Sequence, residues 1–98
     1  MEFKGTKGEW EVSKIDLFDF KQICIFQNES PKGKAICHMY FKNEITQEIE
    51  ANAQLIASAP ELLEFLIELY EDKETYSDMF PNQQIKLKEL IEKATKID

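Results

Sequence analysis

The stretch Lys34-Ala-Ile-Cys-His-Met-Tyr-Phe-Lys42 carries the clearest strand signal in the chain. Isoleucine, tyrosine and phenylalanine, which favour extended backbone, recur within it. The preceding Asn28-Glu-Ser-Pro-Lys-Gly33 is typical of a turn, because proline fixes φ and glycine accepts positive φ. We therefore expect residues 34–42 to pair with the apolar stretch Ile23–Phe26 across this turn.

Residues upstream of this pair predict one or two further strands. Between Glu9 and Ile15 the apolar residues alternate at Trp10 and Val12, a period typical of a half-buried strand. Leu17–Phe20 is another apolar stretch, which joins residues 23–26 in one irregular strand or forms a short strand of its own. The first half of the chain thus predicts a small antiparallel meander.

After Thr46 the periodicity becomes helical. Thr46 is the predicted N-cap of a first helix, whose apolar stripe is Ile49, Ala53, Ile56 and Ala57. Ser58-Ala-Pro-Glu61 predicts a stop and a restart, because it has capping-box spacing and a proline suited to the first helical position. A second helix is expected to about Lys73, followed by a loop over Glu74–Asp78. The last helix is expected from Asn82 to about Thr95, with these side chains facing inward: Ile85, Leu87, Leu90, Ile91 and Ala94.

These patterns predict an α+β fold, with a small antiparallel sheet of three to four strands followed by two to three helices packed on one face. The 98 residues are the length of a single domain, with a β-rich part over 1–45 and a helical part over 46–98. A domain of this size buries only about two-thirds of its unfolded surface, so a homodimer would be a natural source of extra stability. The sequence leaves open whether one forms.

The charge of the chain argues against two classes of partner. The net charge is −7 and all twelve basic residues are lysine, whereas nucleic-acid binding relies on clustered lysine and arginine. An anionic membrane surface is disfavoured for the same reason. The first residues contain no apolar run, so we expect no signal peptide. Two cysteines do not make a disulfide scaffold, and we expect a cytoplasmic protein.

The residue types needed for catalysis are scarce. The one histidine, His38, follows Cys37 directly, and neighbours on a strand point to opposite faces of a sheet. A pair between Cys24 and His38 is left open, against the interpretation that the thiols are small core side chains. The cysteines and His38 lack zinc-site spacing, and the acidic residues lack a calcium-loop pattern. We therefore predict no catalytic residue, no metal site and no cofactor, and a protein that is not an enzyme.

Two surfaces are candidate partner-binding sites. The helices can cover only one face of the sheet, so the second face is expected to expose Ile36, His38 and Tyr40. The alternative is that the N-terminal segment with Phe3 and Trp10 folds over that face. The other candidate surface is the acidic stretch after residue 60, for which we single out Glu64, Glu68, Glu71 and Asp72.

Two motifs carry a family resemblance. Gly8-Glu-Trp10 and the run Ala51-Asn-Ala-Gln-Leu-Ile-Ala-Ser-Ala-Pro-Glu-Leu-Leu-Glu64 resemble segments of small, mostly uncharacterised bacteriophage and prophage proteins. The resemblance implies an accessory protein that acts in the host cytoplasm by binding a host protein. The chain is similar in size and charge to inhibitors of host defence, among them anti-CRISPR proteins. The alternative is a sponge that sequesters a small nucleotide signal at a dimer interface.

Overall fold

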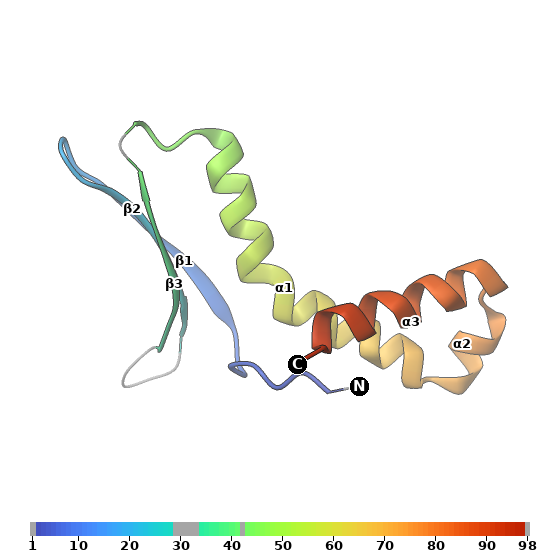
Figure 1. Ribbon diagram of the computed structural model, residues 1–98. Coiled ribbons are helices and arrows are strands. Elements are labelled where there is room, and N and C mark those ends of the chain that lie inside the picture. Colours follow the sequence, from blue (N-terminus) through green and yellow to red (C-terminus); the bar gives the residue numbers. More distant parts are fainter. Residues whose placement is uncertain (1, 29–33, 42, 98) are drawn as a thin grey trace. The chain divides into compact units, whose positions relative to one another are not determined.

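The computed structural model describes residues 2–28, 34–41 and 43–97. They form three strands and three helices in the order β1 (Trp10–Asp16), β2 (Lys21–Gln27), β3 (Lys34–Phe41), α1 (Gln47–Glu71), α2 (Lys73–Asp78) and α3 (Pro81–Thr95) (Figure 1). The predicted α+β class is confirmed. The chain divides into two compact units, one spanning Thr6–Pro60 and the other combining the N-terminal residues up to Gly5 with the chain from Glu61 onward.

The sheet is an antiparallel meander with strand order β1-β2-β3. The expected pairing of β2 with β3 is confirmed, and the turn predicted over residues 28–33 lies almost wholly outside the described residues. The expectation that Leu17–Phe20 belongs to a strand is wrong. Leu17 and Phe20 instead close the β1–β2 hairpin, since the Leu17 N–H donates to the Phe20 carbonyl at 2.8 Å.

A β-bulge interrupts β3 and changes which side chains share a face. Ile25 pairs with Cys37 but Phe26 pairs with Ala35, so Ile36 is the extra residue between them. The strict alternation that would place Ile36 on one face with His38 and Tyr40 is therefore wrong at the start of the strand. Beyond the bulge the alternation holds, and Cys37 and His38 lie on opposite faces.

The first half of α1 lies over one face of the sheet within the unit Thr6–Pro60 (Figure 1). In the described part of this unit the buried core includes two residues of β2 and two of α1: Ile23, Ile25, Ala53 and Ala57. Alanine has the smallest side chain that still favours a helix, so the helix backbone can approach the sheet closely. The predicted core positions of this helix are confirmed at its alanines, whereas Ile56 is partly exposed.

The stop and restart predicted at residues 58–61 is wrong, because α1 runs through Pro60 without a break. A proline inside a helix removes the backbone donor to the carbonyl four residues earlier, at a cost of about 3 kcal/mol. The neighbouring alanines and leucines are strong helix formers, and Pro60 itself is buried. Helix propensity and burial therefore outweigh the capping pattern, although the boundary between the two units falls at this residue.

The second unit is helical and has a small core of Leu63, Leu87 and Ile91. The loop expected over residues 74–78 is wrong, because the Asp72 carboxylate caps the N-terminus of α2 by accepting from the Thr75 backbone N–H. The predicted last helix is confirmed as α3, with Pro81 at its first turn. Its expected inward stripe holds only at Leu87 and Ile91, since Ile85 is 60% exposed.

The Gly8-Glu-Trp10 motif has a structural role at the start of β1. Gly8 has a φ of +95°, and a Cβ there would lie 2.7 Å from the Gln27 amide nitrogen. The Trp10 indole N–H donates to the Thr6 carbonyl at 3.1 Å. Trp10 shares its strand face with Val12, on the α1 side of the sheet, so it does not cover the opposite face.

The burial of Ala53 gives a direct test. The substitution Ala53→Leu forces extra methylenes into a fully buried position and should cost about 1–3 kcal/mol in the free energy of unfolding. The same substitution at the exposed Ala59 should change it by less than about 0.5 kcal/mol. Urea denaturation measures both, and equal losses at the two positions would contradict this packing.

Candidate functional site

The tip of the β1–β2 hairpin exposes large apolar side chains. Phe18 is fully exposed, and Leu17 is 57% exposed. Phe20 packs its ring against Tyr40 of β3, with 5.9 Å between the ring centroids, and Tyr40 is itself 66% exposed. Backbone bonds of the turn join Leu17 to Phe20, whereas Phe18 lines a shallow hollow with Lys21. We call Leu17, Phe18, Phe20 and Tyr40 the hairpin-tip patch.

The sheet face turned away from the first half of α1, which we call the open face, continues from this patch. Cys24 pairs with His38 across β2 and β3, and Gln22 pairs with Tyr40. The Gln22 amide nitrogen contacts His38 Nδ1, and the His38 and Tyr40 rings are stacked at 6.3 Å. The Gln22 side chain thereby fixes the orientation of the His38 ring on this face.

The Cys24–His38 pair left open by the sequence does form a contact, at 4.0 Å between Sγ and Nε2. This separation is at the outer limit for a hydrogen bond to sulfur, and Gln22 contacts the other ring nitrogen, Nδ1. Activation of a nucleophile needs a base within about 2.6–3.2 Å of it. The geometry therefore does not make Cys24 a nucleophile activated by His38.

The three sheet residues singled out from the sequence have different environments. His38 and Tyr40 are exposed on the open face, as expected. Ile36 lies at the β-bulge, where it has no direct cross-strand partner, and its side chain is half-buried. The structure therefore brings His38 and Tyr40 together with Gln22 and Phe20, and leaves Ile36 at the other end of the strand.

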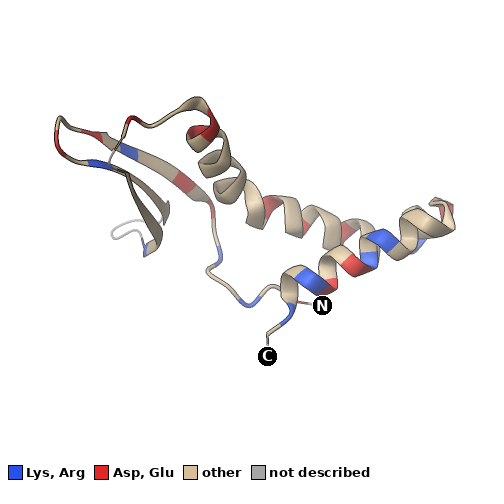
Figure 2. Ribbon diagram, turned by 45° about the horizontal axis from the view of Figure 1, so that its top comes forward, with Lys and Arg blue, Asp and Glu red and all other residues tan. Residues whose placement is uncertain are grey.

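The acidic residues singled out on α1 share one side of the helix. Glu64, Glu68 and Glu71 are exposed and spaced by four and three residues, which places them on neighbouring turns. None of the three forms an ion pair with another residue of the described ranges. Figure 2 shows acidic positions along α1 in red. Asp72 differs, since its carboxylate also accepts from the Thr75 hydroxyl at 2.9 Å.

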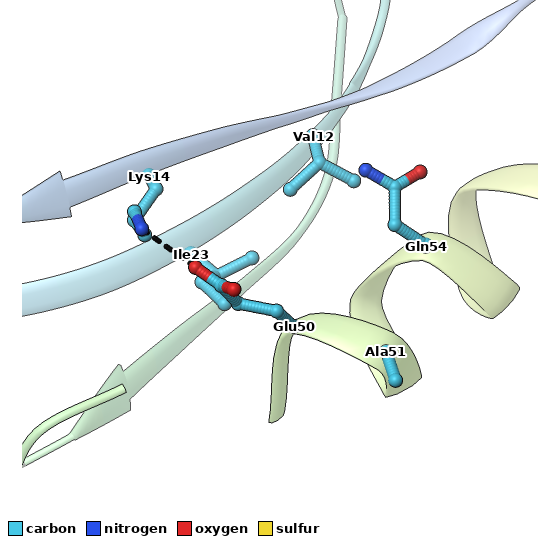
Figure 3. A pocket seen from close by; sticks show the side chains of 6 residues that line it. All are labelled: Val12, Lys14, Ile23, Glu50, Ala51 and Gln54. Atoms are coloured by element: carbon cyan, nitrogen blue, oxygen red, sulfur yellow. Dashed lines mark hydrogen bonds and ion pairs between the residues drawn. The ribbon is translucent and has the colours of Figure 1, made fainter. Parts of the chain in front are cut away.

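A groove that the sequence did not reveal lies between α1 and strands β1 and β2 (Figure 3). It has a volume of about 380 Å³ and is lined by Val12, Lys14, Ile23, Glu50, Ala51 and Gln54. The Lys14 ammonium donates to the Glu50 carboxylate at 2.6 Å, and this bond raises the pKa of Lys14. The groove thus combines an apolar floor with one ion pair and one amide.

Neither a metal centre nor a membrane span is found in the part of the chain that is described. Over residues 2–28, 34–41 and 43–97, no three histidine, cysteine, aspartate or glutamate side chains gather as a potential metal site. Across the same ranges no helix has both the length and the hydropathy needed to cross a bilayer.

The hairpin carries an ion pair whose pH dependence can be measured. The Lys21 ammonium donates to the Asp16 carboxylate and holds the pKa of that carboxyl below its ordinary 3.8. A lowered folded pKa gives stability that is present above the unfolded value and is lost as the pH falls through the folded value. Asp16 should therefore titrate below 3.8 by NMR, with the hairpin weakening over that range. Replacing Lys21 with Met should return the pKa toward 3.8, and an unchanged value would contradict the pairing.

A comparison with known proteins identifies the family of this chain. No curated protein and no solved structure matches the chain. A family model described as Salmonella phage P22 protein Y8K6 matches residues 1–97, which is nearly the whole chain. The phage resemblance of the sequence is therefore confirmed at the level of the family. The chain belongs to the family of Salmonella phage P22 protein Y8K6.

Proposed function

We propose that this phage-family protein is an accessory protein that acts in the host cytoplasm by binding a host protein and inhibiting it, with a defence component as the target. The observation that carries the proposal is the hairpin-tip patch. Leu17 and Phe18 stand at the end of a hairpin, and Phe20 and Tyr40 extend the apolar surface onto the open face. A group of large, exposed apolar side chains of this kind is typical of a protein-interaction site.

The energetics favour a role in binding over a role in the fold. Burying an exposed phenylalanine yields about 1.5–3 kcal/mol, and here that free energy is unused because Phe18 is fully exposed. Aromatic side chains on a short, hydrogen-bonded turn lose little conformational entropy when a partner covers them. Tyrosine is enriched among the residues that dominate interface energies. The patch therefore has the composition of an interface centre.

The charge of the chain supports a basic surface on the partner. The chain carries a net charge of −7, and Glu64, Glu68 and Glu71 form an exposed acidic row on α1. Acidic groups outside the contact centre accelerate encounter with a basic protein more than they strengthen the complex. A defence protein that handles nucleic acid presents such a basic surface. Inhibition then follows from occupation of that surface, with no reaction catalysed by this chain.

The proposal is tested by phage growth. Phage that encode the natural protein or the Phe18→Ser variant should be plated on matched host strains that carry or lack single defence systems. At least one defence system should reduce plating of the Phe18→Ser phage, because the variant loses the apolar anchor. The natural phage should plate normally on that strain.

The matched control is Phe80→Ser, which removes another exposed phenylalanine from the other unit. Phe80 is the N-cap residue of α3, and serine is a favourable N-cap, so the fold should not suffer. The Phe80→Ser phage should plate like the natural phage. Equal plating of all three phages on every strain, with both variants folded, would contradict the proposal.

A further inference from the structure

Among the residues that the structure describes, none pairs with the outer edge of the sheet at β1. Leu17 and Phe20 bond to each other through the backbone, and the Asn28 N–H donates to the Glu9 carbonyl at 3.0 Å. In an antiparallel ladder such bonded pairs recur at every second residue. The odd-numbered residues of β1 therefore bond to β2, and Val12 and Lys14 direct their N–H and C=O groups to the free edge.

The same two residues place their side chains in the groove beneath α1. Val12 and Lys14 line it from the edge strand, and Gln54 lines it from the helix (Figure 3). The Gln54 amide makes no hydrogen bond with any residue of the described ranges. The unpaired edge of β1 thus lies directly beside the groove. An added strand would find backbone partners along the edge and room for a side chain beside it.

We propose that the edge of β1 at Val12 and Lys14 accepts an extended segment of the host protein as an added antiparallel strand. The residue of that segment opposite Val12 is aliphatic and enters the groove, and the residue opposite Glu11 is basic. This inference rests on the proposed function, namely that the chain binds a host protein, and it specifies the chemistry of the recognised segment.

The alternation of the segment follows from the strand geometry. A residue opposite Val12 in an antiparallel pair shares its face, so its side chain points into the groove. Its neighbours point to the open face, where Glu11 projects from β1 and accepts from the Asn28 amide at 2.8 Å. Glu9 adds a second carboxylate on this face, whereas Asp16 lies on the groove face and is paired with Lys21. Lysine or arginine opposite Glu11 complements this charge.

A second copy of this chain fits the edge less well than a basic segment. Pairing of two β1 strands would bring together two segments with the same acidic excess, in a chain whose net charge is −7. A single charged side chain on an edge strand also opposes indiscriminate pairing, and Lys14 provides one. The Lys14–Glu50 ion pair leaves the groove itself neutral, so an aliphatic side chain meets no unpaired charge there.

The test is NMR of the full ¹⁵N-labelled chain with the peptide acetyl-Lys-Val-Lys-Val-Lys-Val-Lys-amide. The amides of Val12 and Lys14 should shift saturably and become protected from hydrogen exchange. N-methylation of the valines removes the donors that face β1 and should weaken binding by about tenfold or more. N-methylation of the lysines should weaken it much less, and the peptide with glutamate in place of lysine should not bind.

Two variants of the chain supply the matching control. Lys14→Ala and Lys14→Pro both remove the ion pair with Glu50, but only proline also removes the outward N–H. The proline variant should bind the peptide about tenfold more weakly than the alanine variant. If Lys14→Pro does not fold, the two N-methylated peptides decide the question.

Three results would overturn the inference: unchanged amides at Val12 and Lys14, shifts confined to another surface, or equal binding of the two N-methylated peptides. The experiments distinguish failure of strand addition at β1 from failure of the proposed function. If the peptide leaves the β1 amides unchanged while Phe18→Ser still impairs plating, strand addition at β1 is wrong and the proposed function remains supported. If β1 binds the peptide but Phe18→Ser plates normally everywhere, the proposed function falls.

Discussion

The packing of two helix alanines on two sheet isoleucines fixes the arrangement of the unit Thr6–Pro60. Ala53 and Ala57 on α1, and Ile23 and Ile25 on β2, are buried in this unit. The helix occupies one face of the sheet and leaves the other open. The groove beside β1 and the open face both follow from where this helix lies.

The surfaces left uncovered differ in charge and in polarity. The hairpin tip is apolar, the open face carries polar groups such as His38 and Gln22, and the acidic row occupies α1 beyond Pro60. Under the proposed function, the apolar tip would supply the contact centre and the net charge of −7 would favour a basic partner.

Much of the fold was predictable because strand and helix periods are strong local signals. The β2–β3 pairing, α3 and the exposed His38 and Tyr40 were all expected from residue patterns. The continuous α1 was not, because a capping pattern around Pro60 is a local preference that helix propensity and burial overrode. The hairpin turn was missed for a related reason. Its central residues, Phe18 and Asp19, have negative φ and include no glycine, so the usual hairpin signal is absent.

The candidate surfaces were harder to predict than the fold. The groove joins Val12 and Lys14 to Glu50 and Gln54, residues more than thirty positions apart, and no periodicity reveals that they meet. The acidic row could be read directly, since spacing alone places Glu64, Glu68 and Glu71 on one side of a helix. The second role of Asp72, as the N-cap of α2, became visible only in three dimensions.

Binding of a host protein through the hairpin-tip patch can be measured most directly by photo-crosslinking inside infected host cells. Benzoylphenylalanine replaces Phe18 or, as a reference, Phe80. Both positions are exposed, so nonspecific crosslinking should occur at both. A discrete host protein should be crosslinked from position 18 and should not be crosslinked from position 80. The same pattern of crosslinks from both positions, or none from position 18 beyond background, would contradict it.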